Sequence, residues 1–166
     1  MKNILLIIVF ICCVFIGISI KNFYKKRKLF YYNLKLFCDN LINEISYNNE
    51  KLELILSKSF NLYNKDFTNL INDFYLLITN QINQKTFNNN INKNLNFLNE
   101  SEKCFVYNFF NNLGGLTKDE EIQRVCNLKL EIERLKNETF ENDKKFSNLY
   151  FKLFIILGMV VVIFFI

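Results

Sequence analysis

Apolar residues are distributed along this chain in two different ways. Residues 4–20, and again the residues from 153 to the end, form uncharged runs that are apolar on every side. Between these runs apolar residues recur every three or four positions, and no segment alternates apolar and polar residues with the period of two typical of a strand. The pattern predicts an all-α chain, with a bundle of about six helices flanked by an N-terminal and a C-terminal transmembrane helix.

The helical spacing divides the middle of the chain into segments. Helices are predicted over about 29–47, 52–63, 67–82, 100–112 and from 117 onward, while the Asn-rich stretch 83–96 is either a short helix or a loop. The residues expected on the inward faces are Leu34, Phe37, Cys38, Leu41, Ile42 and Ile45, then Leu70, Ile71, Phe74, Leu77 and Ile78, and in the Asn-rich stretch Phe87, Ile91 and Leu95. In the next segment the apolar residues are Cys104, Phe105, Tyr107 and Phe109. Asn costs about 0.6 kcal/mol relative to Ala in a helix interior, so packing rather than propensity must hold these helices.

The last segment, Thr117 to Ile166, is predicted to be one continuous helix that begins in water and ends inside a bilayer. Thr117 and Glu120 have the spacing of a capping box, in which the hydroxyl accepts from an early backbone N–H and the carboxylate reaches back to the cap. Gly114 and Gly115 are expected to end the preceding helix. One stripe should face a partner: Val125, Leu128, Ile132, Leu135, Thr139, Asn142, Phe146 and Leu149.

Two charge pairs are expected on the outer face of this helix. Glu120 with Arg124, and Glu141 with Lys145, are four residues apart with the acid first, which is the favourable orientation. Each pair contributes only a few tenths of a kcal/mol.

The first apolar run is the right length for a membrane span. Its 17 residues, Ile4 to Ile20, extend about 25 Å as a helix. A cleaved signal peptide is the alternative, but the run lacks a small-residue cleavage site and is followed at once by the basic residues 25–28. A retained anchor is therefore the favoured interpretation.

The distribution of charge predicts a topology. Only Lys2 precedes the first run, five positive residues lie in 21–28, and Lys144, Lys145 and Lys152 flank the second run. The positive-inside rule then gives a hairpin in the cell membrane. Residues 1–3 are a short outer tail, 4–20 a transmembrane helix, 21–148 a cytoplasmic helical domain with a basic collar at 21–28, and 149–166 a second transmembrane helix.

Composition changes little in this picture. The chain of 166 residues contains no Ala, Pro, His or Trp but 27 Asn and 19 Phe, a bias towards AT-rich codons that we attribute to the genome. A prion-like tract is the alternative for Asn clusters such as 88–90, but apolar residues at helical spacing interrupt them. The net charge of +5 could indicate nucleic-acid binding, yet five positive residues lie beside the first apolar run, where a membrane collar explains them better.

The sequence contains no residue pattern that predicts catalysis. There is no His to act as a base, no phosphate-binding glycine loop, and no C-x-x-C among Cys12, Cys13, Cys38, Cys104 and Cys126. The scattered odd set of thiols suits a reducing compartment. The acidic residues 119–121 lie in the first turn of a helix, where they complement its dipole, and the mixed charges of 129–138 are typical of a solvated face. We expect no enzyme, no catalytic, cofactor or metal site, no nucleic-acid partner and no small-molecule substrate.

Several short motifs can be recognised along the chain. The stretch Leu41 to Tyr47 fits an L-x-x-E-I-x-Y motif after the collar. Phe110 to Gly114 fits F-x-x-L-G, and Asp119 with Gln123 fits D-x-x-x-Q. Tyr150 and Gly158 fit a tyrosine followed by a glycine-containing apolar tail. In these motifs and in its layout the chain resembles the stage III sporulation protein AB family.

Three features depart from that family's pattern. The segment between Gly114 and Asp119 is about two residues longer, the proline-containing turn after Tyr47 is absent, and Phe154 stands where a first glycine is expected.

The resemblance implies a helical domain similar to the cytoplasmic domain of the type II secretion F platform protein. It implies a non-enzymatic platform in the mother-cell membrane around the forespore, within a secretion-like channel complex. Other stage III sporulation proteins, including a secretion-type ATPase, are the implied partners, and homo-oligomerisation is left open. The alternative is a membrane-anchored helical regulator or sensor unrelated to sporulation.

Overall fold

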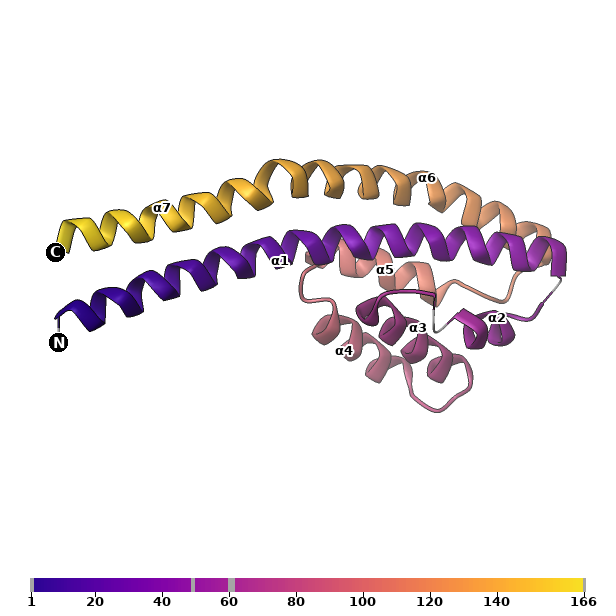
Figure 1. The fold of residues 1–166 in the computed structure, drawn as a ribbon. Helices are drawn as coiled ribbons and strands as arrows, with labels where there is room; N and C mark the ends of the chain where they lie inside the picture. Colours follow the sequence, from indigo (N-terminus) through magenta and orange to yellow (C-terminus); the bar gives the residue numbers. More distant parts are fainter. Residues whose placement is uncertain (1, 49, 60–61, 166) are drawn as a thin grey trace. The chain divides into compact units, whose positions relative to one another are not determined.

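A computed structural model describes residues 2–48, 50–59 and 62–165 (Figure 1). These residues form helices and turns without a strand, which confirms the all-α prediction. The α-helices are α1 (Lys2–Asn43), α2 (Leu52–Ser59), α3 (Lys65–Ile78), α4 (Gln84–Asn94), α5 (Glu100–Asn111), α6 (Lys118–Asn142) and α7 (Asn148–Phe165). Two π-helical turns, η1 (Glu44–Asn48) and η2 (Asp143–Ser147), follow α1 and α6.

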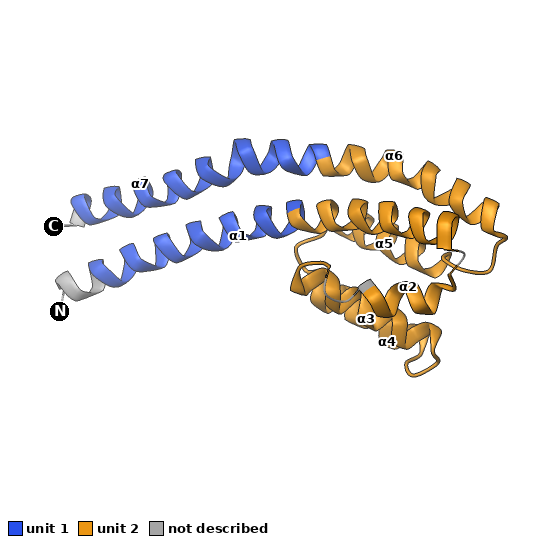
Figure 2. Ribbon diagram, turned by 45° about the vertical axis from the view of Figure 1, so that its right-hand side comes forward, with its two compact units in different colours: residues 1–28, 137–166 blue, residues 29–136 orange. Residues whose placement is uncertain are grey.

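The chain forms two compact units, which Figure 2 shows in different colours. Unit 1 contains residues 1–28 and 137–166, and unit 2 contains residues 29–136. The division falls within α1 and within α6, so each of these helices contributes to both units. The predicted membrane boundaries at 4–20 and 149–166 stay predictions.

Most predicted helices are present with shifted ends. The first apolar run and the predicted helix 29–47 are one helix, α1, because no Gly or Pro interrupts the chain between Gly17 and its end at Asn43. The helix predicted over 67–82 ends at Ile78, and Asn80 just beyond it has φ of 58°, a left-handed conformation that stops a helix. In the Asn-rich stretch the helical alternative is the correct one, as α4.

Asparagine begins three of the helices. Asn64, Asn83 and Asn99 are the N-caps of α3, α4 and α5, and each side chain accepts a hydrogen bond from the backbone N–H three residues on. At α5 the Glu102 carboxylate also accepts from the Asn99 N–H, which completes a capping box. Such caps are each worth about 1 kcal/mol, so part of the Asn excess stabilises helix starts.

The core of unit 2 is built largely of phenylalanine. Phe37 of α1, which is fully buried, lies 6.0 Å from the ring of Phe67 and 5.8 Å from that of Phe110, both measured between centroids. Phe110 in turn packs 5.0 Å from Phe74. The inward faces predicted for α1, α3 and α4 are confirmed, with Ile42, Ile45, Leu77 and Ile78 only half-buried against the core. In α5 the buried apolar residues are Val106, Phe109 and Phe110, whereas Cys104 is exposed.

Ion pairs join α1 to α6 inside unit 2. Lys35 Nζ lies 3.0 Å from Glu133 Oε1, and Lys129 Nζ lies 2.5 Å from Asp39 Oδ1. The predicted solvated face of α6 is thus partly engaged with α1. The expected pair of Glu141 with Lys145 is present at 3.7 Å, but Arg124 pairs with Glu121 instead of Glu120.

The predicted stripe of the last helix is correct in its first part and wrong in its second. Val125, Ile132, Leu135 and Thr139 are buried, and Leu128 is half-buried. Asn142 is half-buried, and Phe146 is 37% exposed with its ring 6.3 Å from that of Tyr24 on α1. Leu149 is exposed, while Ser147 and Gly158 are buried. The π turn η2 is the cause, because its wider turn adds a residue and rotates the following face.

In unit 1 the start of α1 packs against α7 through glycines. A Cβ on Gly158 would lie 3.0 Å from Phe10 Cδ2 and 3.2 Å from Cys13 Cβ. A Cβ on Gly17 would lie 3.2 Å from Phe151 Cδ2 and 3.4 Å from Phe154 Cβ. Phe154 stands where the family pattern has a glycine. Because Gly17 on the facing helix has no side chain, it leaves room for Phe154.

Unit 1 leaves many apolar side chains uncovered. Phe15 is 65% exposed and Ile163 is 75% exposed. Within the described residues two helices, Leu6–Asn48 and Lys118–Phe164, are long and apolar enough to cross a membrane. Exposure of this apolar surface distinguishes them from core helices of a soluble protein and indicates membrane association.

Candidate docking surface

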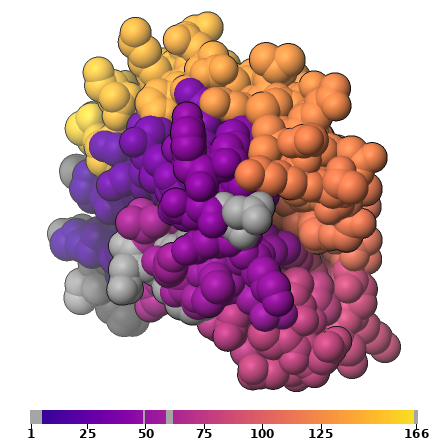
Figure 3. Space-filling view, turned by 90° about the vertical axis from the view of Figure 1, so that its right-hand side faces the viewer, coloured from indigo at the N-terminus to yellow at the C-terminus, as the bar shows by residue number. Residues whose placement is uncertain are grey.

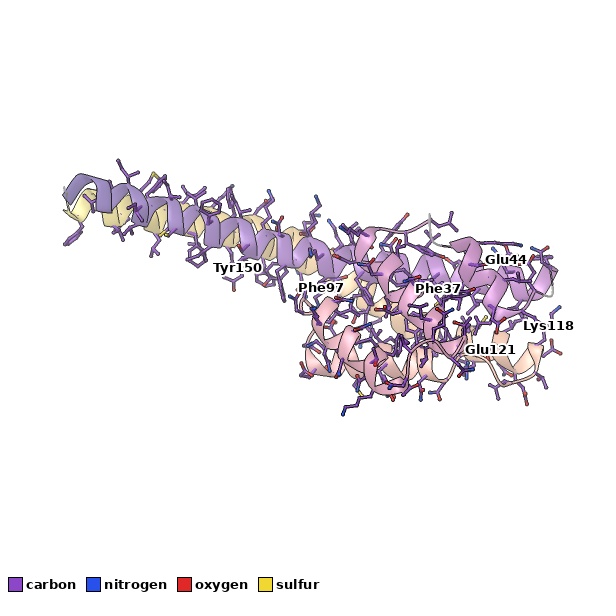
Figure 4. The ribbon with its side chains drawn as sticks, turned by 90° about the horizontal axis from the view of Figure 1, so that it is seen from below. Phe37, Glu44, Phe97, Lys118, Glu121 and Tyr150 are labelled. Atoms are coloured by element: carbon purple, nitrogen blue, oxygen red, sulfur yellow. The ribbon has the colours of Figure 1, made fainter. Side chains whose placement is uncertain are left out.

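Two segments far apart in the sequence meet at one end of unit 2. The first is the end of α1 with η1 and the start of α2, and the second is the turn from α5 into α6 (Figure 3). Lys118 Nζ donates to the Ser46 carbonyl at 3.0 Å, and a Cβ on Gly114 would meet Leu52 Cδ2 at 3.3 Å. Figure 4 labels Glu44, Lys118 and Glu121 at this end.

The turn into α6 depends on two glycines. Gly114 has φ of 79° and Gly115 has φ of 108°, a region in which L side chains are strained. This pair was predicted to end the preceding helix, but α5 ends at Asn111 with Asn112 as its C-cap, so the two glycines lie beyond the cap. The two glycines supply the sharp change of direction within the segment that is longer than the family pattern.

An ion pair between the buried Glu121 and the partly exposed Arg124 holds this turn in place. The Glu121 side chain is only 8% exposed, and it accepts from the Gly114 N–H at 3.3 Å and from Arg124 at 2.5 Å. Glu121 Oε2 and Arg124 Nε are buried without a hydrogen-bond partner. Removing one residue of such a pair leaves the charge of the other without its partner. We therefore infer that Glu121 positions the turn rather than contacting a partner protein.

The start of α6 differs in one detail from the predicted capping box. The Thr117 N–H donates to Glu120 Oε2 at 3.0 Å, as expected. The Thr117 hydroxyl, however, donates to the same oxygen at 2.6 Å, where an accepting role was predicted. These hydrogen bonds lower the pKa of Glu120 below its usual value.

Apolar side chains project into solvent from these segments. Tyr47 of η1 is 85% exposed, Leu54 of α2 is 53% exposed and Leu116 is 49% exposed. We call these three residues the Tyr47 surface. A soluble domain does not gain stability from an uncovered tyrosine ring, whereas tyrosine is enriched at the energetic centres of protein interfaces.

Charged residues lie close to the Tyr47 surface in the sequence. Glu50 and Lys58 form an ion pair, and its hydrogen bond raises the pKa of the Lys58 ammonium. Glu53 and Asp119 are exposed nearby in the sequence. An apolar centre with a charged rim is the usual composition of a protein-binding surface.

The motif residues singled out in the sequence divide between the two units. The stretch 41–47 and the residues 110–123 come together in unit 2, where the buried members carry the core and Tyr47 faces solvent. Tyr150 and Gly158 lie in unit 1. Leu54 and Leu116 were not predicted from the sequence to be surface residues. A single exposed leucine has no periodic signal that separates it from a core position.

The described residues contain no group of three or more Cys, Asp or Glu side chains placed to hold a metal ion. Of the thiols, Cys13 and Cys38 are buried, and Cys12, Cys104 and Cys126 are exposed. Burial raises the pKa of Cys38 to about 12, so this thiol is not a nucleophile at neutral pH.

Comparison with known proteins identifies the family. The sequence model of stage III sporulation protein AB matches residues 2–166, which is nearly the whole chain. No curated protein and no solved structure matches the chain. The resemblance carried by the motifs of 41–47 and 110–123 is thereby confirmed. The chain therefore belongs to the stage III sporulation protein AB family and has a role in sporulation.

Proposed function

We propose that this protein is a non-enzymatic membrane platform in a secretion-like channel complex between mother cell and forespore. It holds partner proteins against the mother-cell membrane and performs no chemistry itself. The observation that carries the proposal is the Tyr47 surface, in which Tyr47 of η1 is 85% exposed and Leu54 of α2 and Leu116 are about half-exposed. Of these, Leu116 lies on the turn that the ion pair of Glu121 with Arg124 holds in place. An exposed apolar surface of this kind is suited to docking.

The proposed topology is a hairpin with unit 2 in the cytoplasm. The two apolar helices are its spans, and the positive residues that follow the first and precede the second stay on the cytoplasmic side. This arrangement would keep the Tyr47 surface available to cytoplasmic proteins. Anchoring raises the local concentration of whatever docks there.

A secretion-type ATPase of the sporulation complex is the proposed partner at the Tyr47 surface. This choice rests on the family's likeness to a secretion platform, and the exposed charged residues near Tyr47, Leu54 and Leu116 in the sequence offer such a partner polar contacts. A regulator unrelated to sporulation, the alternative raised from the sequence, does not fit the family match. The lack of any His in the chain agrees with a holding rather than a catalytic role.

Binding of the purified ATPase to the full chain in nanodiscs tests the proposal. Tyr47→Asp combined with Leu116→Asp should weaken binding at least about 30-fold, because loss of an interface hot spot costs about 2 kcal/mol or more. Leu130→Asp is the matched control, since Leu130 is 73% exposed on α6 but lies outside the Tyr47 surface. Equal affinity of all three proteins would remove the Tyr47 surface as the docking site.

A further inference from the structure

A shallow hollow in unit 1 lies where the first apolar run meets the basic collar. It has a volume of about 450 Å³ and is lined by Ser19, Ile20, Phe23, Tyr24 and Tyr150. The lining is almost entirely carbon, and no carboxylate contributes to it. Tyr150, which Figure 4 labels on α7, resembles a family motif residue for which the docking surface gives no role.

The wall of the hollow is held in place by stacked rings. The Tyr24 ring lies 6.3 Å from the Tyr150 ring with an angle of 8° between their planes, and 6.3 Å from the Phe146 ring. Phe23 meets Tyr24 edge-on at 5.8 Å. Aromatic side chains at the end of an apolar run are typical of the headgroup level of a membrane.

The net positive charge of the chain comes from residues that are close in the sequence to those lining this hollow. Residues 21–28 and 137–152 contain eight Lys and Arg residues and three carboxylates, so their net charge equals the +5 of the whole chain. The three carboxylates are engaged: Glu138 pairs with Arg27 at 3.7 Å, Asp143 with Lys28, and Glu141 with Lys145. An uncompensated positive field therefore remains at this level.

Part of that charge extends over the same helix face as the hollow. Lys26 and Arg27 follow Phe23 by three and four residues, which places both one turn further along its face of α1. Lys21 and Lys25 belong to the opposite face, where the Lys21 ammonium lies 5.4 Å from the Phe151 ring centre. The hollow thus has an apolar floor with cations on the side away from the apolar run.

We propose that this hollow binds an anionic phospholipid, with the upper acyl chain and glycerol against the rings and the phosphate beside Lys26 and Arg27. The charge distribution selects this occupant. A second copy of the chain in the same orientation would bring its own collar of +5 to the same level, which like-charge repulsion disfavours. The inference rests on the proposed membrane topology and is independent of docking at the Tyr47 surface.

The test uses the full chain in phosphatidylcholine vesicles that contain a minority of phosphatidylglycerol, with either lipid brominated to quench fluorescence. The chain has no Trp, so Phe23→Trp places a single reporter at the hollow. Ile8→Trp, at a 55%-exposed position within the apolar run, is the matched reporter away from it. We expect an apparent preference for phosphatidylglycerol of about 30-fold at the hollow, from roughly two favourable charges, and none at the control position.

Charge variants distinguish lipid binding at this hollow from a general attraction of anionic lipid to all of the basic residues. Lys26→Gln with Arg27→Gln should abolish the preference at the Phe23→Trp reporter, whereas Lys21→Gln with Lys25→Gln removes the same charge from the opposite face and should leave most of it. The proposed site is wrong if both double variants lose the preference for phosphatidylglycerol equally, or if both Trp reporters show the same preference. Quenching at Ile8→Trp without quenching at Phe23→Trp shows that protein covers the hollow and also overturns it. Absence of quenching at both reporters overturns the membrane topology together with this inference.

Discussion

Replacing Ile132 by Asp should unfold unit 2. Ile132 is fully buried in the core between α6 and the other helices of the unit. The change loses the burial of an aliphatic side chain, about 1.5 to 3 kcal/mol, and places an unpaired carboxylate in an apolar site for several kcal/mol more. The sum, about 4 to 8 kcal/mol, is comparable to the whole stability of a small domain, about 5 to 15 kcal/mol.

The structure also predicts the rank order along the helix. Leu128 is half-buried, so Leu128→Asp should cost roughly half as much, while Asn137 is exposed and Asn137→Asp should stay within about 0.5 kcal/mol. Urea unfolding of a 25–148 fragment, followed by far-UV circular dichroism, measures all three. With a slope of about 2 kcal/mol per molar, even a loss of 4 kcal/mol at Ile132 shifts the midpoint by about 2 M. Equal midpoints for the three variants would mean that a different stripe of α6 faces the core.

Four further predictions follow from the structure. A membrane-impermeant maleimide added to intact cells should leave the exposed Cys104 and Cys126 unlabelled and should label both after permeabilisation; labelling before that step reverses the hairpin. Cys38 should resist alkylation at pH 8 in the native protein and react in urea, because burial raises its pKa to about 12; rapid native reaction would contradict its burial. Burial also raises the pKa of Asp73 in the folded state, so stability is lost as the pH rises through the interval between the unfolded and folded pKa values. Asp73→Asn should therefore stabilise the 25–148 fragment against urea at pH 7 and have no effect well below pH 3.8, and equal stability at pH 7 would refute this sign. Finally, Gly158→Leu should lower the melting temperature of the full chain in detergent, since even a Cβ there lies 3.0 Å from Phe10, and an unchanged melting temperature would show that α1 and α7 do not pack so closely.

The core of unit 2 was accessible from the sequence because its signal is periodic. Residues such as Phe37, Phe74 and Ile91 recur at helical spacing, and all three are buried. The fold class and the inward faces therefore followed from local spacing. Apolar spacing did not decide between helix and loop for the Asn-rich stretch. The helix there depends on the Asn83 cap and on contacts such as that of Phe87 with Phe74.

Other features could not be obtained from periodicity. The π turn η2 changes the helical register, so the stripe extrapolated beyond Thr139 selected Leu149, which is exposed on α7. The Tyr47 surface depends on a contact between Lys118 and Ser46, which are 72 residues apart. Tyr150 was recognised as a motif residue, but its ring contacts with Tyr24 and Phe146 could not be predicted from the sequence.

Counting heat-resistant spores in a clean deletion strain tests the central claim, which is that the protein acts in sporulation by holding partners at a membrane. The deletion should block spore development after engulfment and leave vegetative growth intact. The full chain should restore spores, whereas the fragment from Lys25 to Asn148, which lacks both anchors, should not, because it loses the local concentration that anchoring provides. Full restoration by that soluble fragment at matched expression would contradict the platform mechanism, and normal sporulation of the deletion strain would contradict the proposed role altogether.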